Sequence, residues 1–159
     1  MQQCRLSGVT REITGGEDHT VSADLSRKLR ALERAELFSG LARKQLRLLA
    51  FGARWYHAEA GDYVFHQGDD LSIGAFLVWE CTAELLDPRQ EGDARIITTS
   101  KPGDLVGELG LIRGVPRALD MRAFSDLTCL RVSAADFLAV VKNDAATAYK
   151  LLQVVAGYV

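Results

Sequence analysis

Hydrophobic residues follow two different periods along this chain, and the changes of period divide the sequence into parts. Residues 22–52 carry leucines at helical spacing between arginines and lysines, which predicts two amphipathic helices with a break at 37–41. Residues 53–132 approach a period of two, which is typical of short strands. Residues 133–159 return to helical spacing. The pattern predicts a mainly β protein with helices at both ends.

The boundaries of the helical parts follow from the capping residues. Ser22 or Asp24 is the expected N-cap of the first helix, and Ser133 is the expected N-cap of the helix that follows the strands. A last helix is expected to run from Asp144 to the final residue. Residues 1–21 are polar and aperiodic, so we expect a flexible N-terminal segment.

The central part reads as a series of short strands separated by Gly, Pro and Asp turn signals. Apolar runs that predict strands occur at residues 55–58, 63–66, 73–79, 83–86, 95–99, 119–123 and 127–132. Short strands at even spacing indicate a β-sandwich or jelly roll (a double-stranded β-helix) rather than a parallel sheet.

Composition limits the function classes. The 159 residues suit one domain, and the 48% hydrophobic content is ordinary for a globular protein. A formal net charge of −2 gives no overall attraction to nucleic acid. No apolar run reaches the roughly 18 residues of a membrane span, and the N-terminus lacks the apolar core of a signal peptide, so we expect a cytoplasmic protein.

The residues that carry metal and enzyme chemistry are scattered. Cys4, Cys81 and Cys129 fit no disulfide framework and no metal spacing, and we expect small residues in a reducing compartment. They are too few for an iron–sulfur cluster with four thiolate ligands. The three histidines are isolated, and no nucleophile or phosphate-loop motif is present. We therefore expect a binding module without catalytic or metal-ligating residues.

One stretch, residues 107–123, combines a Glu and an Arg with several small residues. Arg117 is a permanent cation whose planar fork matches two phosphate oxygens. Glu108 is an acceptor suited to a sugar hydroxyl. Glycines between them allow main-chain N–H groups to approach an anion. The stretch predicts a ligand with a ribose on one side and a phosphate on the other.

This stretch resembles the phosphate-binding cassette of cyclic-nucleotide-binding domains, Phe-Gly-Glu-Leu-Ala-Leu, a short loop, then Pro-Arg-Ala-Ala-Thr-Val-x-Ala. The matching residues are Gly107, Glu108, Leu109, Leu111, Pro116, Arg117, Ala118 and Ala123. Ala60–Asp62 with Phe65–Asp69, and Pro102–Gly107, resemble two further segments of the family, so the resemblance covers residues 33–159. It implies a cyclic-nucleotide-binding domain over residues 22–159, with helices at 22–52, a β-roll at 53–132 and C-terminal helices at 133–159.

The resemblance implies a role for each matched residue. Arg117 would pair with the cyclic phosphate, Glu108 would bind the ribose 2′-hydroxyl, and main-chain N–H groups near Gly110 and Ala118 would help to hold the phosphate. Gly107, Leu109 and Pro116 complete the implied site. Ala after the arginine goes with adenine in this family, whereas Ser or Thr goes with guanine, so cAMP is expected over cGMP.

Three positions depart from the family pattern. Asp120 stands where Thr is usual, and strand alternation predicts that it points away from the phosphate. Gly110 stands where Ala is usual. Cys81 falls where a turn glycine normally lies, and it is strained if that turn requires a positive φ.

The resemblance implies a regulatory sensor whose C-terminal helix closes over the ligand and signals to a fused or associated effector, such as a channel, transporter or enzyme. Two alternatives remain at this point. The domain could be a degenerate fold in which Glu108 and Arg117 pair only with each other, and whose last helix presents Leu151, Leu152 and Val155 to a partner or a second copy. It could also be the sensor half of a transcription regulator, although no DNA-binding segment is present in this sequence.

Overall fold

The computed structural model describes residues 17–70, 73–88 and 95–157 of the chain. The strands are β1 (Arg54–Ala58), β2 (Tyr63–Phe65), β3 (Ala75–Glu80), β4 (Ala83–Asp87), β5 (Arg95–Ser100), β6 (Leu105–Val106), β7 (Asp120–Ala123) and β8 (Leu127–Val132). The helices are α1 (Glu17–Arg34), the 3-10 turn η1 (Glu36–Phe38), α2 (Arg43–Gly52), α3 (Glu108–Arg113), α4 (Ala134–Asn143) and α5 (Ala145–Gly157).

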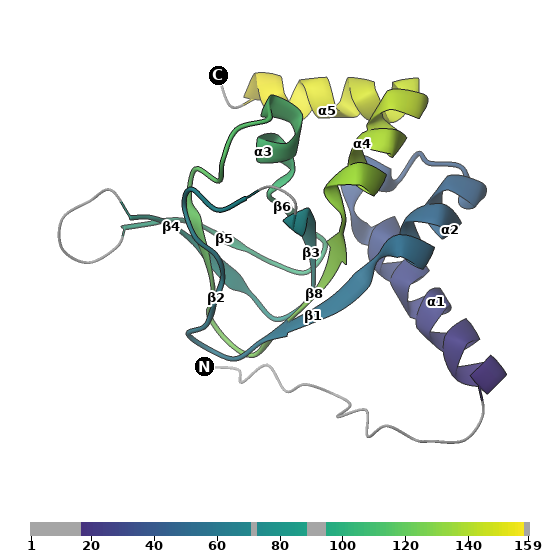
Figure 1. Ribbon diagram of the computed structural model, residues 1–159, viewed down its shortest axis with the longest axis horizontal. Coiled ribbons are helices and arrows are strands. Elements are labelled where there is room, and N and C mark those ends of the chain that lie inside the picture. The colour runs from purple at the N-terminus through teal and green to yellow at the C-terminus, as the bar shows by residue number, and fades with distance from the viewer. Residues whose placement is uncertain (1–16, 71–72, 89–94, 158–159) are drawn as a thin grey trace.

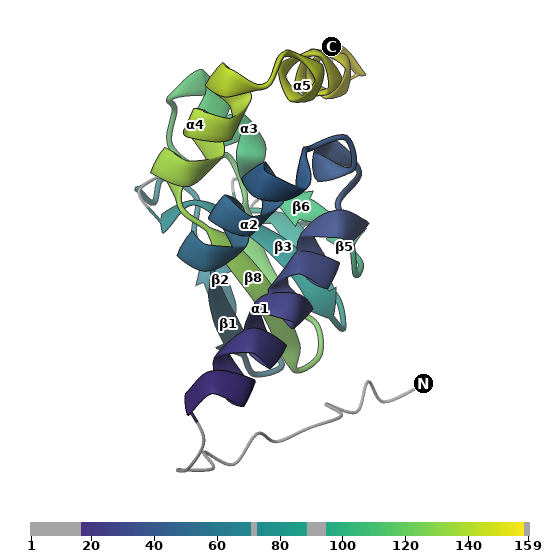
Figure 2. The ribbon, with the colours of Figure 1, turned by 90° about the vertical axis from the view of Figure 1, so that its right-hand side faces the viewer.

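Within these residues the strands form two antiparallel sheets, β1-β8-β3-β6 and β2-β7-β4-β5. The helices gather on one side and at one end of the β-structure, while strands β4 and β5 extend toward the opposite side (Figures 1 and 2). This arrangement confirms the predicted mainly β jelly-roll fold with helices before and after the strands. Every predicted apolar run coincides with a strand, whereas β6 and α3 were not predicted.

Two layers of apolar packing explain the strand sequences. Phe76 and Val78 of β3 belong to the core between the two sheets, whereas Leu77 belongs to the core beneath the helices. Cys129 and Leu130 of β8 divide in the same way between the two cores. Since both faces of these central strands are largely buried, apolar residues stand at adjacent positions in their sequences instead of strictly alternating with polar ones.

Helix α1 is fixed to the first sheet by aromatic and cationic side chains. The guanidinium of Arg27 lies 4.4 Å from the ring centroid of Trp55, and that of Arg34 lies 4.2 Å from Trp79. Trp55 Nε1 donates a hydrogen bond to Asp24 at 2.7 Å. These contacts set the direction of the chain as it enters η1, which lies beside the candidate site described below.

The predicted caps of α1 are wrong. The helix begins at Glu17, so Ser22 and Asp24 lie inside it, and the Asp24 carboxylate accepts from Trp55 instead of capping a helix end. The cap at Ser133 is confirmed, because its hydroxyl accepts a hydrogen bond from the Asp136 N–H at 3.2 Å. The domain boundary at residues 21 and 22 stays a prediction, and residues 1–16 lie outside the described part.

Cysteine environments differ from the expectation. Cys81 has φ 70°, the one positive φ among the described non-glycine residues, so the predicted strain at this turn is present. Cys81 is also bonded in a disulfide, and the expectation of a reduced residue is wrong for it. Cys129 is a free, buried thiol, and burial raises its pKa to about 12.

The packing of helix α5 differs from the hypothesis that Leu151, Leu152 and Val155 all face a partner. Leu151 is only 3% exposed and belongs to the core beneath the helices, whereas Leu152 is 67% exposed. Leu151 therefore faces the molecule rather than a partner, and the Val155 side chain and residues 158–159 lie outside the described part. Among the described helices, none is long and apolar enough to cross a membrane.

Candidate functional site

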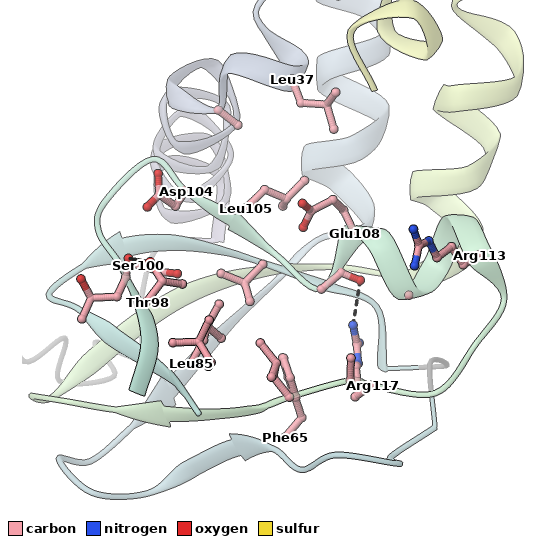
Figure 3. A pocket seen from close by; sticks show the side chains of 18 of the residues that line it. Leu37, Phe65, Leu85, Thr98, Ser100, Asp104, Leu105, Glu108, Arg113 and Arg117 are labelled. Carbon is pink, nitrogen blue, oxygen red and sulfur yellow. Dashed lines mark hydrogen bonds between the residues drawn. The ribbon is translucent and has the colours of Figure 1, made fainter. Parts of the chain in front are cut away.

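A cavity of about 630 Å³ opens between η1, the β5–β6 region, α3 and the segment that leads into β7. Figure 3 shows side chains from these separate parts of the chain pointing into it. Leu37 of η1 and Leu151 of α5 also line the cavity. The cavity therefore brings together residues that are far apart in the sequence.

Glycines at both ends define the short helix that forms one wall. Gly107 precedes α3 with φ 93° and ψ 1°, and Gly114 follows it with φ 63°. Residues other than glycine rarely adopt these angles, so the two glycines fix where α3 begins and ends. A Cβ atom at Gly107 would stand 2.3 Å from Arg117 Nη1, so this glycine also permits the close approach of the arginine.

Arg117 is the central cation of the site and is only 4% exposed. Its Nη1 donates to the Gly107 carbonyl at 2.8 Å (dashed in Figure 3), and its Nη2 donates to the Gly74 carbonyl. The guanidinium carbon lies 4.6 Å from the ring centroid of Phe65. Within the described residues, Arg117 Nε is the one buried side-chain nitrogen or oxygen without a hydrogen-bond partner.

The charge balance at Arg117 reflects its burial. Desolvation lowers the pKa of Arg117 from its ordinary value, and the nearby carboxylates of Asp69 and Glu108 oppose that change. The pKa of Arg117 starts far above neutrality, so the side chain stays a cation at pH 7. A buried cation with an unpartnered N–H attracts an anion that can reach it.

Glu108 begins α3 and lines the same cavity. Burial raises its pKa, while a hydrogen bond to its own main chain and the charge of Arg117 act in the opposite direction. No ion pair joins Glu108 to Arg117 in the part of the chain that the structure describes, so the pairing required by the degenerate alternative is not seen. The carboxylate is available to accept a hydrogen bond from a bound hydroxyl.

Asp120 is buried beneath the 66–69 turn and does not line the cavity. Its Oδ1 accepts from the Gln67 N–H at 2.6 Å and lies 3.8 Å from His66 Nδ1. The Gly68 N–H in turn donates to the Arg117 carbonyl at 2.9 Å. The prediction that Asp120 points away from the site is therefore confirmed, and this residue anchors the turn that packs on Arg117.

Six of the seven residues predicted for the site line the cavity, namely Gly107, Glu108, Gly110, Pro116, Arg117 and Ala118. Leu109 belongs to α3, and its side chain lies outside the described part. Sequence reasoning missed other walls, above all Phe65, Leu85, Ile97, Arg113 and Leu151. Phe65 and Arg113 lie in segments that the sequence pattern had singled out, but nothing in the pattern placed Leu85, Ile97 or Leu151 at this cavity.

The arrangement suits a ligand with a polar end and an apolar end. Arg117, Glu108 and the first turn of α3 provide a cation, an acceptor and main-chain donors at one end. Leu85 and Ile97 provide apolar surface at the other end, beside the hydroxyl-bearing side chains of Thr98, Thr99 and Ser100. Across the described residues, no cluster of three or more His, Cys, Asp or Glu side chains has an arrangement that could hold a metal ion.

Comparison with known proteins adds a family match. A family model described as cyclic nucleotide-binding domain matches residues 56–144, more than half of the chain. Among curated relatives, human patatin-like phospholipase domain-containing protein 6 is 33% identical over 88 residues. That match covers 55% of this chain and 6% of the relative, so the chain spans a small part of the relatives that it matches.

Solved structures share the fold. The sensor domain of the transcriptional regulator DNR from Pseudomonas aeruginosa matches with a TM-score of 0.76 and 18% identity, over 84% of this chain and 89% of that chain. The regulatory domain of Toxoplasma gondii PKA with cAMP matches with a TM-score of 0.67 and 24% identity, over 76% and 46%. At these identities the structural likeness concerns the fold alone.

Proposed function

This chain belongs to the cyclic nucleotide-binding domain family, and from that premise we propose that it is a sensor that prefers cAMP to cGMP and binds it in the cavity beside Arg117. The observation that carries the proposal is the unpartnered Nε of Arg117 in a nearly buried side chain at the cavity wall. Leaving such a donor without a partner costs about 1–3 kcal/mol, and a phosphate oxygen within reach would remove that cost.

We assign the phosphate to Arg117 and the ribose 2′-hydroxyl to Glu108. The N–H of Gly110 lies in the first turn of α3, where main-chain donors have no partner within the helix, and it supports binding of the exocyclic oxygens. Ala118 lines the same cavity and contributes its N–H in this assignment. Gly107 and Pro116 shape the backbone around these groups.

The base then occupies the apolar end of the cavity, against Leu85 and Ile97. We propose adenine rather than guanine, because the residue after the arginine is Ala118, and in the resembled family Ser or Thr at that position goes with guanine. The proposed preference for cAMP rests on this one position.

Signalling would use α5, because this helix already touches both the cavity and η1. Leu151 lines the cavity, and Lys150 Nζ donates to Ser39 Oγ at 2.9 Å. A ligand that contacts Leu151 favours the α5 positions compatible with that contact, which is a shift of population. An effector fused or associated with the chain would respond to this helix, and the much longer phospholipase-domain relative supports a fused enzyme as one such effector.

Isothermal titration of the purified chain with cAMP and cGMP tests the proposal. We expect cAMP to bind more tightly than cGMP, and Arg117→Ala to weaken binding by about 100-fold or more because a charge-assisted contact is lost. Arg30→Ala is the matched control, because Arg30 is an exposed arginine that does not line the cavity. Thermal unfolding of each variant verifies that it is folded.

A second variant protects the test against misfolding, since Arg117 also holds two main-chain carbonyls. Glu108→Ala removes the ribose acceptor without removing a hydrogen bond between different residues, and it should weaken cAMP binding by about tenfold. If the folded wild-type chain binds neither nucleotide, the sensor proposal is wrong. The domain is then better explained as a degenerate fold retained for its helices.

A further inference from the structure

A second candidate surface lies away from the cavity, in a stretch of the chain without acidic residues. Residues 37–58 contain no Asp or Glu but include Arg43, Lys44, Arg47 and Arg54. The whole chain has a formal net charge of −2, so this stretch is a local concentration of positive charge. Such a concentration attracts anionic partners although the overall charge does not.

Helix α2 places these cations on one side together with large apolar residues. At 100° per residue, Arg43, Lys44, Arg47, Leu48 and Phe51 form one continuous face, which we call the α2 face. All five are exposed, Leu48 to 66% and Phe51 to 77%. The opposite side of the helix is buried through Leu46, Leu49 and Ala50.

The cations of the α2 face are not used within the described part of the structure. No ion pair or side-chain hydrogen bond there involves Arg43, Lys44 or Arg47. Arg54 extends the positive charge past the end of the helix, where its Nη1 donates to the Phe51 and Ala53 carbonyls. A Phe and a Leu that project between unpaired cations are energetically unfavourable in water and favourable at an interface.

We propose that the α2 face docks on the surface of an anionic phospholipid membrane. Cationic side chains pair with the headgroups while Phe51 and Leu48 enter the boundary between headgroups and acyl chains, as in helices that lie in the plane of a membrane. The long apolar stems of Lys and Arg allow their charged ends to contact the headgroups while the apolar side of the α2 face lies deeper in the membrane surface. The contact is peripheral and requires no membrane-spanning helix.

The apolar residues favour a membrane over nucleic acid, because binding to a phosphate backbone gains from the cations but not from Leu48. No residue of α2 lines the cavity, and Figure 2 shows α2 on the helical side of the molecule. Docking of the α2 face on a membrane would therefore not cover residues that line the proposed nucleotide site.

Co-sedimentation of the purified chain with vesicles tests this inference. One set is phosphatidylcholine alone, and the other is an equimolar mixture of phosphatidylcholine and phosphatidylserine. We expect binding to the mixed vesicles that weakens as salt is added. Each cation near such a surface contributes about fivefold in affinity, so the triple variant Arg43→Ser, Lys44→Ser, Arg47→Ser should bind about 100-fold more weakly.

Two further variants complete the design. Leu48→Ser with Phe51→Ser keeps every charge and should weaken vesicle binding by at least about tenfold, because the inserted apolar area is lost. A control triple variant has the same net charge as the α2 triple variant but loses three exposed cations elsewhere, through Arg30→Ser, Arg95→Ser and Lys142→Ser. This control should bind much more tightly than the triple variant of the α2 face.

The inference is overturned if the wild-type chain ignores mixed vesicles or binds both vesicle types equally. It is also overturned if the two triple variants lose affinity equally, since net charge would then explain binding. A duplex oligonucleotide serves as the competing probe. The α2 face serves nucleic acid instead if vesicle binding is absent and the wild-type chain binds the oligonucleotide. In that case the affinity for the oligonucleotide should fall in the α2 triple variant and stay unchanged in the Leu48→Ser, Phe51→Ser variant.

Discussion

Arg117 lies so close to Gly107 that the substitution Gly107→Ala should disturb it. Comparison with a glycine in open space then separates the cost of backbone strain from the cost of displacing Arg117. Gly107 has φ 93°, and an added Cβ would lie 2.3 Å from Arg117 Nη1. Gly107→Ala must therefore strain the backbone and also push the guanidinium away. Gly61 provides the matched control, because its φ is 89° and nothing lies within 4 Å of its added Cβ.

The expected free energies differ because only one variant disturbs Arg117. Forcing Ala into the left-handed region costs about 1–2 kcal/mol, and Gly61→Ala should lose that amount of unfolding free energy. Gly107→Ala should lose a further 1.5–3 kcal/mol, approximately the value of a hydrogen bond to a charged group, because the Nη1 bond to the Gly107 carbonyl is broken.

Urea denaturation of the wild-type chain and both variants measures these differences, and nucleotide titration measures their effect on the proposed site. A displaced guanidinium should weaken cAMP binding by at least about tenfold in Gly107→Ala, while Gly61→Ala should stay within about twofold of wild type. Equal losses of stability, together with equal affinities, would refute the reasoning that Gly107 is required for the position of Arg117.

Two further predictions concern the carboxylates near the site. Burial raises the pKa of Glu108 in the folded chain. At a pH above that pKa the charged carboxylate therefore destabilises the folded state. The penalty is absent at a pH below about 4.3, the ordinary pKa of a glutamate in an unfolded chain, because the carboxyl is then protonated in both states. Glu108→Gln should therefore be more stable than wild type at pH 7 and lose this advantage in urea melts at about pH 3; an advantage independent of pH would contradict the assignment. Asp120→Ala should cost about 1–3 kcal/mol, because the Gln67 N–H loses its acceptor, whereas Asp120→Asn should cost less. Asp120 does not line the cavity, so a loss of cAMP affinity larger than about tenfold with intact folding would contradict its structural role.

The strands and most of the site were predictable because their signals are local. Strand β8 has the bounds that its apolar run predicts, since Leu127 and Cys129 pack in one core and Leu130 and Val132 in the other. Glu108 and Arg117 could be placed together because they lie nine positions apart in a glycine-containing stretch that matches a known cassette. The proximity of Asp120 to the 66–69 turn was not predicted, although strand alternation placed it on the correct face.

The missing parts depend on tertiary contacts that no local pattern records. Helix α3 has six residues, too few to display a helical period, and its ends are fixed by glycines whose sign of φ the sequence does not state. Ile97 and Leu151 reach the cavity because β5 pairs with β4 and α5 packs on η1. The Trp55 partner of Asp24 lies 31 positions away, which is why a helix cap was predicted there.

Arg117 bonds to the carbonyls of Gly107 and Gly74, so it joins the start of α3 to the start of β3 through contacts within the protein itself. Natural selection for a folded protein would therefore retain this arginine in a descendant that no longer recognised any nucleotide. Glu108 has no bond to another side chain within the described residues and would be free to change in such a descendant. Among relatives of this chain, the residue at the Glu108 position should be the more sensitive marker of domains that still respond to a ligand.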